Sequence, residues 1–251
     1  EKVSELFSFT LVASSEPGEP PPFALIGKRC EMTLHDGFGV LRSLTGIVAE
    51  AARVVRDDGT CQLEVVMRPA AYPLSISRDS RVFNDMSVPQ SVDKVMEKSD
   101  ASYRWELSDS YRTRVYTAQY REDDWTFISR LLEDEGIYYW FDHEGAETQL
   151  VFSDDSRGAP ELTGGPVIEF HVETGMHGKQ ELAHEFAAEA HAAPTKFTVG
   201  SFDPWNPNLK VMETQGDGVH EMYDAPAGGP EDPSVIKKKA QVRLEYSKCH
   251  R

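Results

Sequence analysis

Apolar and polar residues alternate along the first eighty residues with the period of two that β-strands produce. Phe7, Phe9 and Leu11 are every second residue of one such run, and residues 28–37 form another run that ends in an Asp-Gly turn. Two longer apolar runs, within residues 43–70, are separated by the turn sequence Asp57-Asp58-Gly59, which predicts a β-hairpin. Short strands at this spacing indicate a barrel or a sandwich.

The pattern changes to a helical period in the middle of the chain. After Ser91, a candidate N-cap, apolar residues recur at helical spacing and predict a short helix. A second helix is predicted from Asp123, its N-cap, to Glu135, with Gly136 at the C-terminal cap. Its apolar half contains Trp125, Phe127, Ile128, Leu131 and Leu132. On the polar half, Arg130 and Asp134 are one turn apart and can pair, which would contribute only about 0.2–0.5 kcal/mol.

An aromatic strand is predicted directly after this helix, over residues 137–142, because β-branched and aromatic residues dominate it. Its expected partner is the segment Thr148–Ser153, across a turn. Both faces of the aromatic strand are apolar, so both are expected to be covered. The second cover comes either from the same chain or from another subunit.

The last third of the chain gives mixed signals. Residues 179–191 suggest a helix, and residues 195–211 suggest a strand followed by a loop rich in Pro and Asn. Residues 222–233 are rich in Gly and Pro and are expected to form a loop. The closing segment 234–248 fits either a helix or a strand, and the helix is favoured.

Composition narrows the class of protein. The chain has 251 residues, 39% of them hydrophobic and 27% charged, with a formal net charge of −16. Nucleic acid and acidic membranes are therefore poor partners, although most of this acidity serves solubility. Cys30, Cys61 and Cys249 make no disulfide framework. No apolar run is long enough to span a bilayer, and no signal peptide is expected.

The histidines are the main candidates for a metal site. His177, His184 and His191 recur every seven residues, and Glu185 follows the second of them. On a helix each step of seven residues rises about 10.5 Å, whereas zinc holds imidazole nitrogen at about 2.0–2.1 Å. The favoured interpretation is a solvated helix face, so no metal or cofactor is predicted.

Other catalytic patterns are missing or uninformative. The sequence contains no nucleophile elbow and no Gly-rich phosphate loop. With 42 acidic residues, a glycosidase-like pair of carboxylates carries almost no information. A sugar-binding platform built from Trp125, Tyr138, Tyr139 and Trp140 is a minor alternative to a packed core or a subunit interface.

The central motif carries a resemblance to a known family. Residues 119–144 are similar to the signature of the valine-glycine repeat protein G (VgrG) family, the spike of type VI secretion systems. The matching residues are Tyr120, Arg121, Glu122, Phe127, Arg130, Leu131, Glu133, Glu135, Gly136, Ile137 and Tyr138. Further matches follow in order along the chain, at residues 44–50, 67–96, 197–209 and 222–228.

The resemblance implies a mainly β fold with an α+β insertion, built from β-barrel modules like those of a phage tail hub. We expect a first barrel module over residues 1–80. A middle α+β region over 81–175 contains the Asp123–Glu135 helix and the aromatic hairpin. A second barrel module with the closing segment covers 176–251. The resemblance covers the hub region, and neither the barrel nor the needle that follow it in the family is visible in this sequence.

The resemblance also implies a function that needs no catalytic, cofactor or metal residues. Three copies would form a pseudo-sixfold ring that adapts the sixfold tube of haemolysin-coregulated protein to a threefold needle. Baseplate proteins and effector toxins or their adaptors would be the other partners, and the folded hub would not insert into a membrane. Assembly would occur in the cytoplasm, followed by ejection by the contractile machine without a signal peptide.

Three alternatives remain open from the sequence. One is a tail hub of a contractile phage or phage-like particle, with any cell-wall-degrading domain elsewhere. Another is a secreted metal hydrolase that uses the His177–His191 region. The third is a monomeric carbohydrate-binding module.

Overall fold

The computed structural model describes residues 1–15, 21–35, 40–55, 57, 60–160, 167–170, 182–183, 185–225 and 231–249. The chain divides into two compact units, Glu1–Ala159 and Pro160–Arg251. The boundaries expected from the sequence, at residues 80 and 175, differ from this division because the first sheet and the middle α+β region share one core. The assignment of barrel modules stays a prediction.

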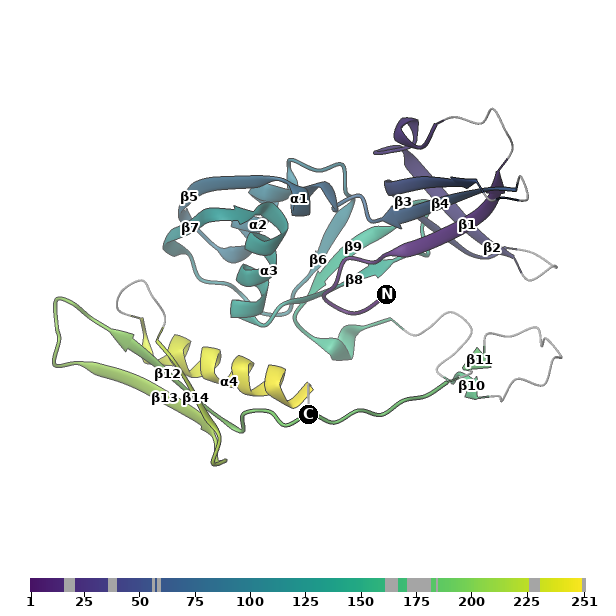
Figure 1. Cartoon of the computed structure of the whole chain (residues 1–251). Helices are drawn as coiled ribbons and strands as arrows, with labels where there is room; N and C mark the ends of the chain where they lie inside the picture. The colour runs from purple at the N-terminus through teal and green to yellow at the C-terminus, as the bar shows by residue number, and fades with distance from the viewer. Residues whose placement is uncertain are drawn as a thin grey trace. The chain divides into compact units, whose positions relative to one another are not determined.

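Unit 1 begins with a four-stranded antiparallel sheet in the order β1-β4-β3-β2 (Figure 1). Its strands are β1 (Phe9–Ser15), β2 (Arg29–His35), β3 (Val40–Val55) and β4 (Cys61–Arg68), with the 3-10 turn η1 at Pro22–Ala24. The sixteen-residue strand β3 pairs with β2 through its first half and with β4 through its second half. The sheet is therefore a half-barrel, and the predicted β3–β4 hairpin is confirmed.

The rest of unit 1 is the α+β part. It contains α1 (Pro73–Ile76), β5 (Arg78–Met86), α2 (Val88–Met96), β6 (Tyr103–Glu106), β7 (Arg114–Asp123), α3 (Asp124–Glu135), β8 (Tyr138–Asp142), β9 (Gln149–Ser153) and the 3-10 turn η2 (Ser156–Gly158). Strands β5 and β7 form a two-stranded antiparallel ribbon, and a second sheet has the order β6-β9-β8. The predicted pairing of the aromatic strand with 148–153 is confirmed.

The helix caps show how well local signals fix helix ends. The Asp123 side chain accepts a hydrogen bond from Thr126 N at 2.8 Å, and Gly136 closes α3 with a φ of 77°; both predicted caps are confirmed. Helix α2 instead begins one turn before the predicted cap, because Ser87 and Gln90 form a reciprocal capping box. Ser91 lies inside the helix and donates to the Ser87 carbonyl at 3.0 Å.

One continuous core joins the parts of unit 1. The predicted apolar face of α3 is buried in it. The predicted Arg130–Asp134 pair is wrong, because neighbouring strand β7 supplies closer partners. Arg130 pairs with Glu122 at 2.6 Å, and Asp134 pairs with Arg114 at 2.7 Å.

The aromatic strand β8 is covered unequally on its two faces. Tyr139 and Phe141 are buried in the core of unit 1, whereas Tyr138 and Trp140 are half-buried. Unit 1 therefore covers the second face only in part.

Unit 2 contains a three-stranded sheet in the order β13-β12-β14, with the long helix α4 on one face (Figure 1). Its elements are β10 (Glu169–Phe170), β11 (Leu182–Ala183), β12 (Lys196–Phe202), β13 (Lys210–Gly216), β14 (Glu221–Asp224) and α4 (Pro233–Cys249). Ile236 and Ala240 of α4 pack against Val199 of the central strand. The favoured closing helix is confirmed.

Two expectations about the last third are wrong. The described residues of the predicted 179–191 helix form strand β11 or lack regular structure. Its Ala-rich composition favours a helix, but the described segment 185–191 has no buried face to stabilise one. Residues 222–224, expected in a loop, belong to β14 and pair in parallel with β12.

Candidate assembly surfaces

The β5–β7 ribbon has one buried face and one exposed face. Phe83, Thr117 and Gln119 point inward and are buried. On the opposite face, Val82, Tyr116 and Tyr120 are 53%, 63% and 69% exposed. Apolar side chains are thus displayed on a regular sheet face, where a partner surface can pack against them.

A bulge at the end of β7 adds an arginine to this exposed face. The strand register shifts between Asp79 and Ser80, and Arg121 has a left-handed φ of 52°. The Arg121 N–H donates to the Ser80 hydroxyl at 3.2 Å, and its guanidinium lies 5.3 Å from the centroid of the Tyr120 ring. The bulge therefore turns Arg121 over Tyr120 in a cation–π contact.

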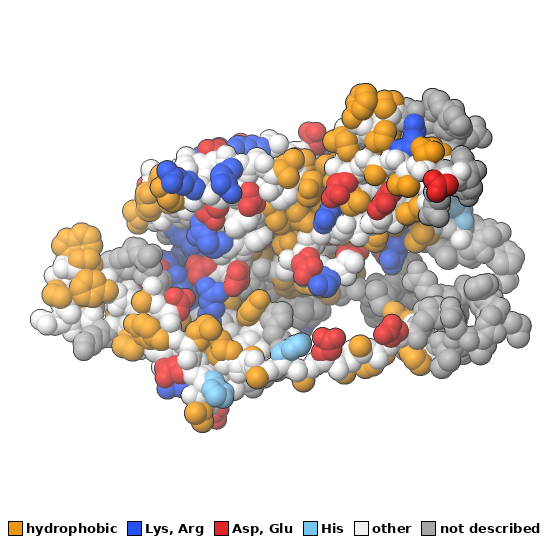
Figure 2. All heavy atoms as spheres, in the orientation of Figure 1, with side chains coloured by type: hydrophobic (Ala, Val, Ile, Leu, Met, Phe, Trp, Pro, Cys, Tyr) orange, Lys and Arg blue, Asp and Glu red, His pale blue; other side chains and the backbone are white. Residues whose placement is uncertain are grey.

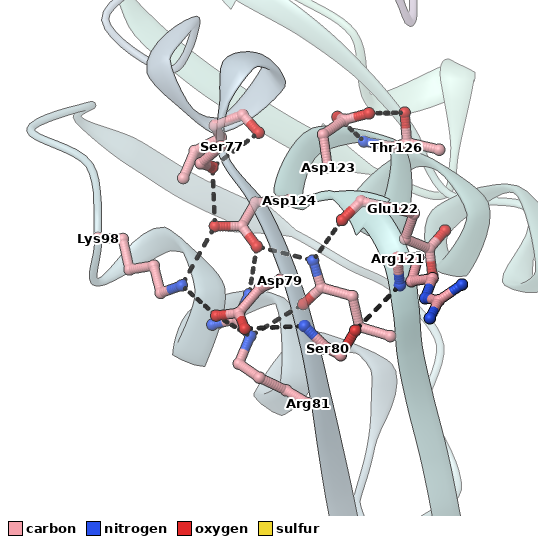
Figure 3. A network of polar contacts seen from close by, with 12 residues as sticks. Ser77, Asp79, Ser80, Arg81, Lys98, Arg121, Glu122, Asp123, Asp124 and Thr126 are labelled. Atoms are coloured by element: carbon pink, nitrogen blue, oxygen red, sulfur yellow. Dashed lines mark hydrogen bonds and ion pairs between the residues drawn. The ribbon is translucent and has the colours of Figure 1, made fainter.

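A buried carboxylate contacts the side chains on the inner face of the ribbon (Figure 3). Asp124, the first residue of α3, is fully buried. It accepts hydrogen bonds from Gln119 Nε2 at 2.8 Å and Ser77 Oγ at 3.1 Å, and it pairs with Arg81 and Lys98. A buried carboxylate without such partners would cost several kcal/mol, so these contacts fix the geometry around it.

Asp79 completes the charge balance of this network (Figure 3). It pairs with Lys98 at 3.0 Å and with Arg81 at 3.3 Å, and the hydrogen bond from Lys98 lowers the pKa of its carboxyl group. Two carboxylates thus face two cations that come from different elements. The network joins the ribbon to the first residue of α3 and to residues that follow α1 and α2. The outer face of the ribbon is therefore held in a fixed orientation.

Unit 2 exposes the sheet face opposite α4. Phe202, Met212 and Tyr223 lie on this face and are all at least half exposed. A Cβ at Gly200 would approach the Tyr223 hydroxyl to 2.6 Å, so the absence of a side chain there lets Tyr223 lie across the central strand. Polar contacts from Thr198 to Thr214 and Glu221 occupy the rest of the face.

Comparison with known proteins assigns the chain to a family. Residues 1–251 match the sequence profile of the phage tail baseplate hub (GPD). The chain belongs to this baseplate hub family. The hub chain is 31% identical over 234 residues to the type VI secretion system spike protein VgrG1a of Pseudomonas aeruginosa, covering 90% of this chain and 36% of that protein. It therefore spans about a third of that relative's length, and the resemblance to VgrG proteins is confirmed.

Solved structures share the fold of the hub chain. The tail protein from Neisseria meningitidis matches with a TM-score of 0.66 and 14% identity, over 97% of this chain and 69% of that one. The E. coli c3393 protein, described as a component of the type VI secretion system, matches with a TM-score of 0.60 and 19% identity, over 94% and 64%. The mainly β, tail-hub-like fold expected from the sequence is confirmed.

The aromatic residues of the hub chain do not form a sugar platform. Trp125 and Tyr139 are buried in edge contact with each other, with ring centroids 5.2 Å apart, and burial raises the pKa of Tyr139 to about 12. Trp140 stacks under the Arg104 guanidinium at 5.7 Å. Trp125 and Tyr139 thus serve core packing, as the favoured interpretation predicted, whereas Tyr138 and Trp140 are half-buried on the other face of β8.

Of the three candidate histidines, His191 is the one that the structure describes. His191 is exposed beside Glu189 at 3.5 Å, while His177 and His184 lie outside the described residues. In the part of the chain that the structure describes, no group of three His, Cys, Asp or Glu side chains is placed to hold a metal ion. Cys30 and Cys61 lie half-buried in strands, Cys249 is exposed, and burial raises the pKa of the Cys30 thiol.

No helix in the described ranges combines the length and the hydropathy that a bilayer crossing needs.

Proposed function

We propose that this hub chain assembles as a trimer with pseudo-sixfold symmetry in a type VI secretion machine. The observation that carries the proposal is the match to the baseplate hub family along the whole chain, together with 31% identity to a type VI spike protein. Exposed apolar sheet faces in both units support it, because a sheet face of this kind is stabilised when a neighbour covers it.

The proposed trimer would connect a sixfold tube to a threefold needle. Its partners would be the haemolysin-coregulated tube protein, baseplate proteins, and effector toxins or adaptors. The chain would act by binding alone, without chemistry of its own. It would assemble in the cytoplasm and be translocated by the contractile machine without a signal peptide.

Sedimentation of the purified chain across a concentration series, followed by imaging, tests the ring. We expect a mass that rises to three copies and ring-shaped particles, which then bind purified tube protein at one end. A chain that stays monomeric at all concentrations and binds no tube protein would refute the proposal.

A tail hub of a contractile phage or phage-like particle is the second candidate. The fold match to a Neisseria tail protein supports it, whereas the sequence identity favours the type VI system. The two are separated by the tube that binds: a type VI tube protein or a phage tail-tube protein, mixed with the same hub preparation.

A further inference from the structure

The outer face of the β5–β7 ribbon, which we call the ribbon face, has a composition that suits recognition. It displays Val82, Tyr116 and Tyr120, with Arg78 at one end of β5 and Arg121 on the bulge. Tyrosine and arginine are the side chains most enriched at the energetic centres of protein interfaces. The cross-strand pairs Ser80–Tyr120, Val82–Ala118 and Asn84–Tyr116 contain no carboxylate. At the end of the ribbon Arg78 is opposite Asp123, whose carboxylate accepts hydrogen bonds from Thr126.

The two arginines of the ribbon face are available to an external partner. In the described part of the chain, neither Arg78 nor Arg121 forms an ion pair with a carboxylate. Figure 2 shows Lys and Arg side chains over the β5–β7 part of the molecule, with Asp and Glu side chains beside them. The chain as a whole has a net charge of −16. A sheet face with two arginines that have no carboxylate partner in the described residues is therefore suited to an acidic partner surface.

A second sheet face of the same unit offers the opposite chemistry. Strands β1, β4 and β3 place Val12, Glu64 and Ala52 directly opposite one another, with Glu50 and Val54 flanking Ala52 on the same side of β3. We call this the acidic face. Val12 and Val54 are 60% and 46% exposed. Figure 2 shows acidic and hydrophobic side chains interspersed over β3 and β4.

The acidic face also lacks internal charge partners. The other side chains on it are Thr10, Ser14, Gln62 and Val66. Arg68 follows Val66 on the same side at the end of β4, where its guanidinium lies 5.5 Å from the centroid of the Tyr72 ring. Among the described residues, no ion pair joins Glu50 or Glu64 to a cation. The face therefore combines valines with unpaired carboxylates, whereas the ribbon face combines valine and tyrosines with unpaired arginines.

We propose that the ribbon face of one copy packs on the acidic face of a second copy of this chain. Both faces are regular sheet surfaces, which pack face to face at about 10 Å. Valines and tyrosines would supply the apolar contact, and Arg78 and Arg121 would pair with Glu50 and Glu64. This inference rests on the proposed ring assembly and names the surfaces that form its contacts.

The two faces are different surfaces of one chain, so the contact is heterologous. Such a contact repeats from copy to copy and closes into a ring when the rotation between copies allows it. The charge pairs would mainly set specificity and the rate of association, with a strong dependence on salt. The tyrosines beside the arginines would supply most of the affinity.

Charge reversal on the full chain tests the contact by sedimentation at low salt. Reversing the ribbon face with Arg78→Glu and Arg121→Glu is expected to weaken self-association by at least about tenfold. Reversing the acidic face with Glu50→Arg and Glu64→Arg is expected to weaken it similarly. Combining all four substitutions in one chain restores opposite charges across the contact and the original net charge, so association should return.

Matched controls separate this contact from a general charge effect. Lys237→Glu with Lys248→Glu, both on exposed positions of α4, changes the net charge as much as the ribbon-face reversal and should leave association unchanged. Circular dichroism of each variant checks that the fold is retained.

Each result bears on one of the two proposals. Trimers that persist unchanged in both reversal variants would overturn the pairing of faces while leaving the ring itself standing. A four-substitution variant as weak as either pair would also overturn it. A native chain that never associates would refute the ring and this contact together.

Discussion

The two units of this hub chain differ in how much of their own sheet surface they bury. Unit 1 has a core cluster of twenty buried residues that joins the half-barrel, the helices and the aromatic hairpin. The cluster of unit 2 contains three buried residues, Val199, Ile236 and Ala240, among those the structure describes. Only the α4 side of its sheet is covered by this cluster.

The two units use their large apolar side chains differently. In unit 1 a large core of apolar residues stabilises the unit itself, and part of the exposed apolar set, including Val12, Val82 and Tyr116, lies on sheet faces. In unit 2 the exposed set, which includes Phe202, Met212 and Tyr223, is large beside a small core. The stability of unit 2 should therefore depend more on contacts with partner chains, whereas unit 1 should be stabilised mainly by its own core.

Two tryptophans give the largest expected contrast between the units. Trp125 is 7% exposed and its indole N–H donates to the Tyr139 hydroxyl at 3.3 Å, whereas Trp205 in unit 2 is 85% exposed. Trp125→Ala should lower the free energy of unfolding by about 3–5 kcal/mol, and Trp205→Ala should change it by less than about 0.5 kcal/mol. Urea titrations followed by circular dichroism measure both. Equal effects would show that α3 does not anchor the core.

The next largest effect is expected at the network behind the ribbon. Asp124→Ala removes the buried carboxylate and leaves Arg81 and Lys98 with Asp79 as their acidic partner among the described residues. Because Arg81 and Lys98 keep some access to water, we expect a loss of about 2–4 kcal/mol. Asp123→Ala, which removes only the α3 cap, should cost about 1 kcal/mol. A smaller loss for Asp124→Ala than for Asp123→Ala would mean that the network does not hold the ribbon.

Local signals made α3 and the β3–β4 hairpin predictable from the sequence. A cap, an apolar stripe and a terminal glycine all act within the segment, so Asp123, the buried stripe and Gly136 could be identified directly. The aromatic strand and its partner were predictable for the same reason. The whole-chain resemblance supplied the tail-hub fold.

The exposed ribbon face could not be predicted, because its pattern is inverted. In β7 the polar residues Thr117 and Gln119 point inward, while Tyr116 and Tyr120 point outward. Gln119 is inside because it donates to Asp124, which lies on the following helix. Alternation alone would put the tyrosines in the core. The unpaired charges of the two faces depend equally on which distant residues lie nearby.

The small core of unit 2 should respond locally to truncation. Ile236 is a fully buried residue of α4 that packs against Val199. Ile236→Ala should destabilise unit 2 by about 2–3 kcal/mol, which is at the low end for such a truncation because a small core can close around the gap. Amide hydrogen exchange should show faster exchange in β12 and α4 with little change in α3. Lys237→Ala, at the next and exposed position, serves as the control. Equal changes in both units would contradict two separately stabilised cores.

The smallest expected effect is a pH dependence at the end of β9. Partial burial would raise the pKa of Asp154, but hydrogen bonds from the Ser108 and Asp109 N–H groups outweigh burial and lower the pKa to about 2. A carboxyl group whose pKa is lower in the folded chain than in the unfolded chain stabilises the fold above the unfolded pKa. That contribution is lost as the pH falls through the folded pKa.

Asp154→Asn should therefore lower stability at neutral pH, by about 1 kcal/mol after allowance for solvent screening. The difference from the native chain should shrink as the pH falls from about 4 to about 2. Glu221 of unit 2 also has a lowered pKa, chiefly because Thr198 donates a hydrogen bond to it, but its side chain is 40% exposed and it belongs to the other unit. Glu221→Gln should leave the pH dependence of unit 1 unchanged. Urea titrations across this pH range measure the free energy of unfolding of each chain. If the native and Asp154→Asn chains differed by the same amount at every pH, the loop at Ser108 would not be held by an ionised Asp154.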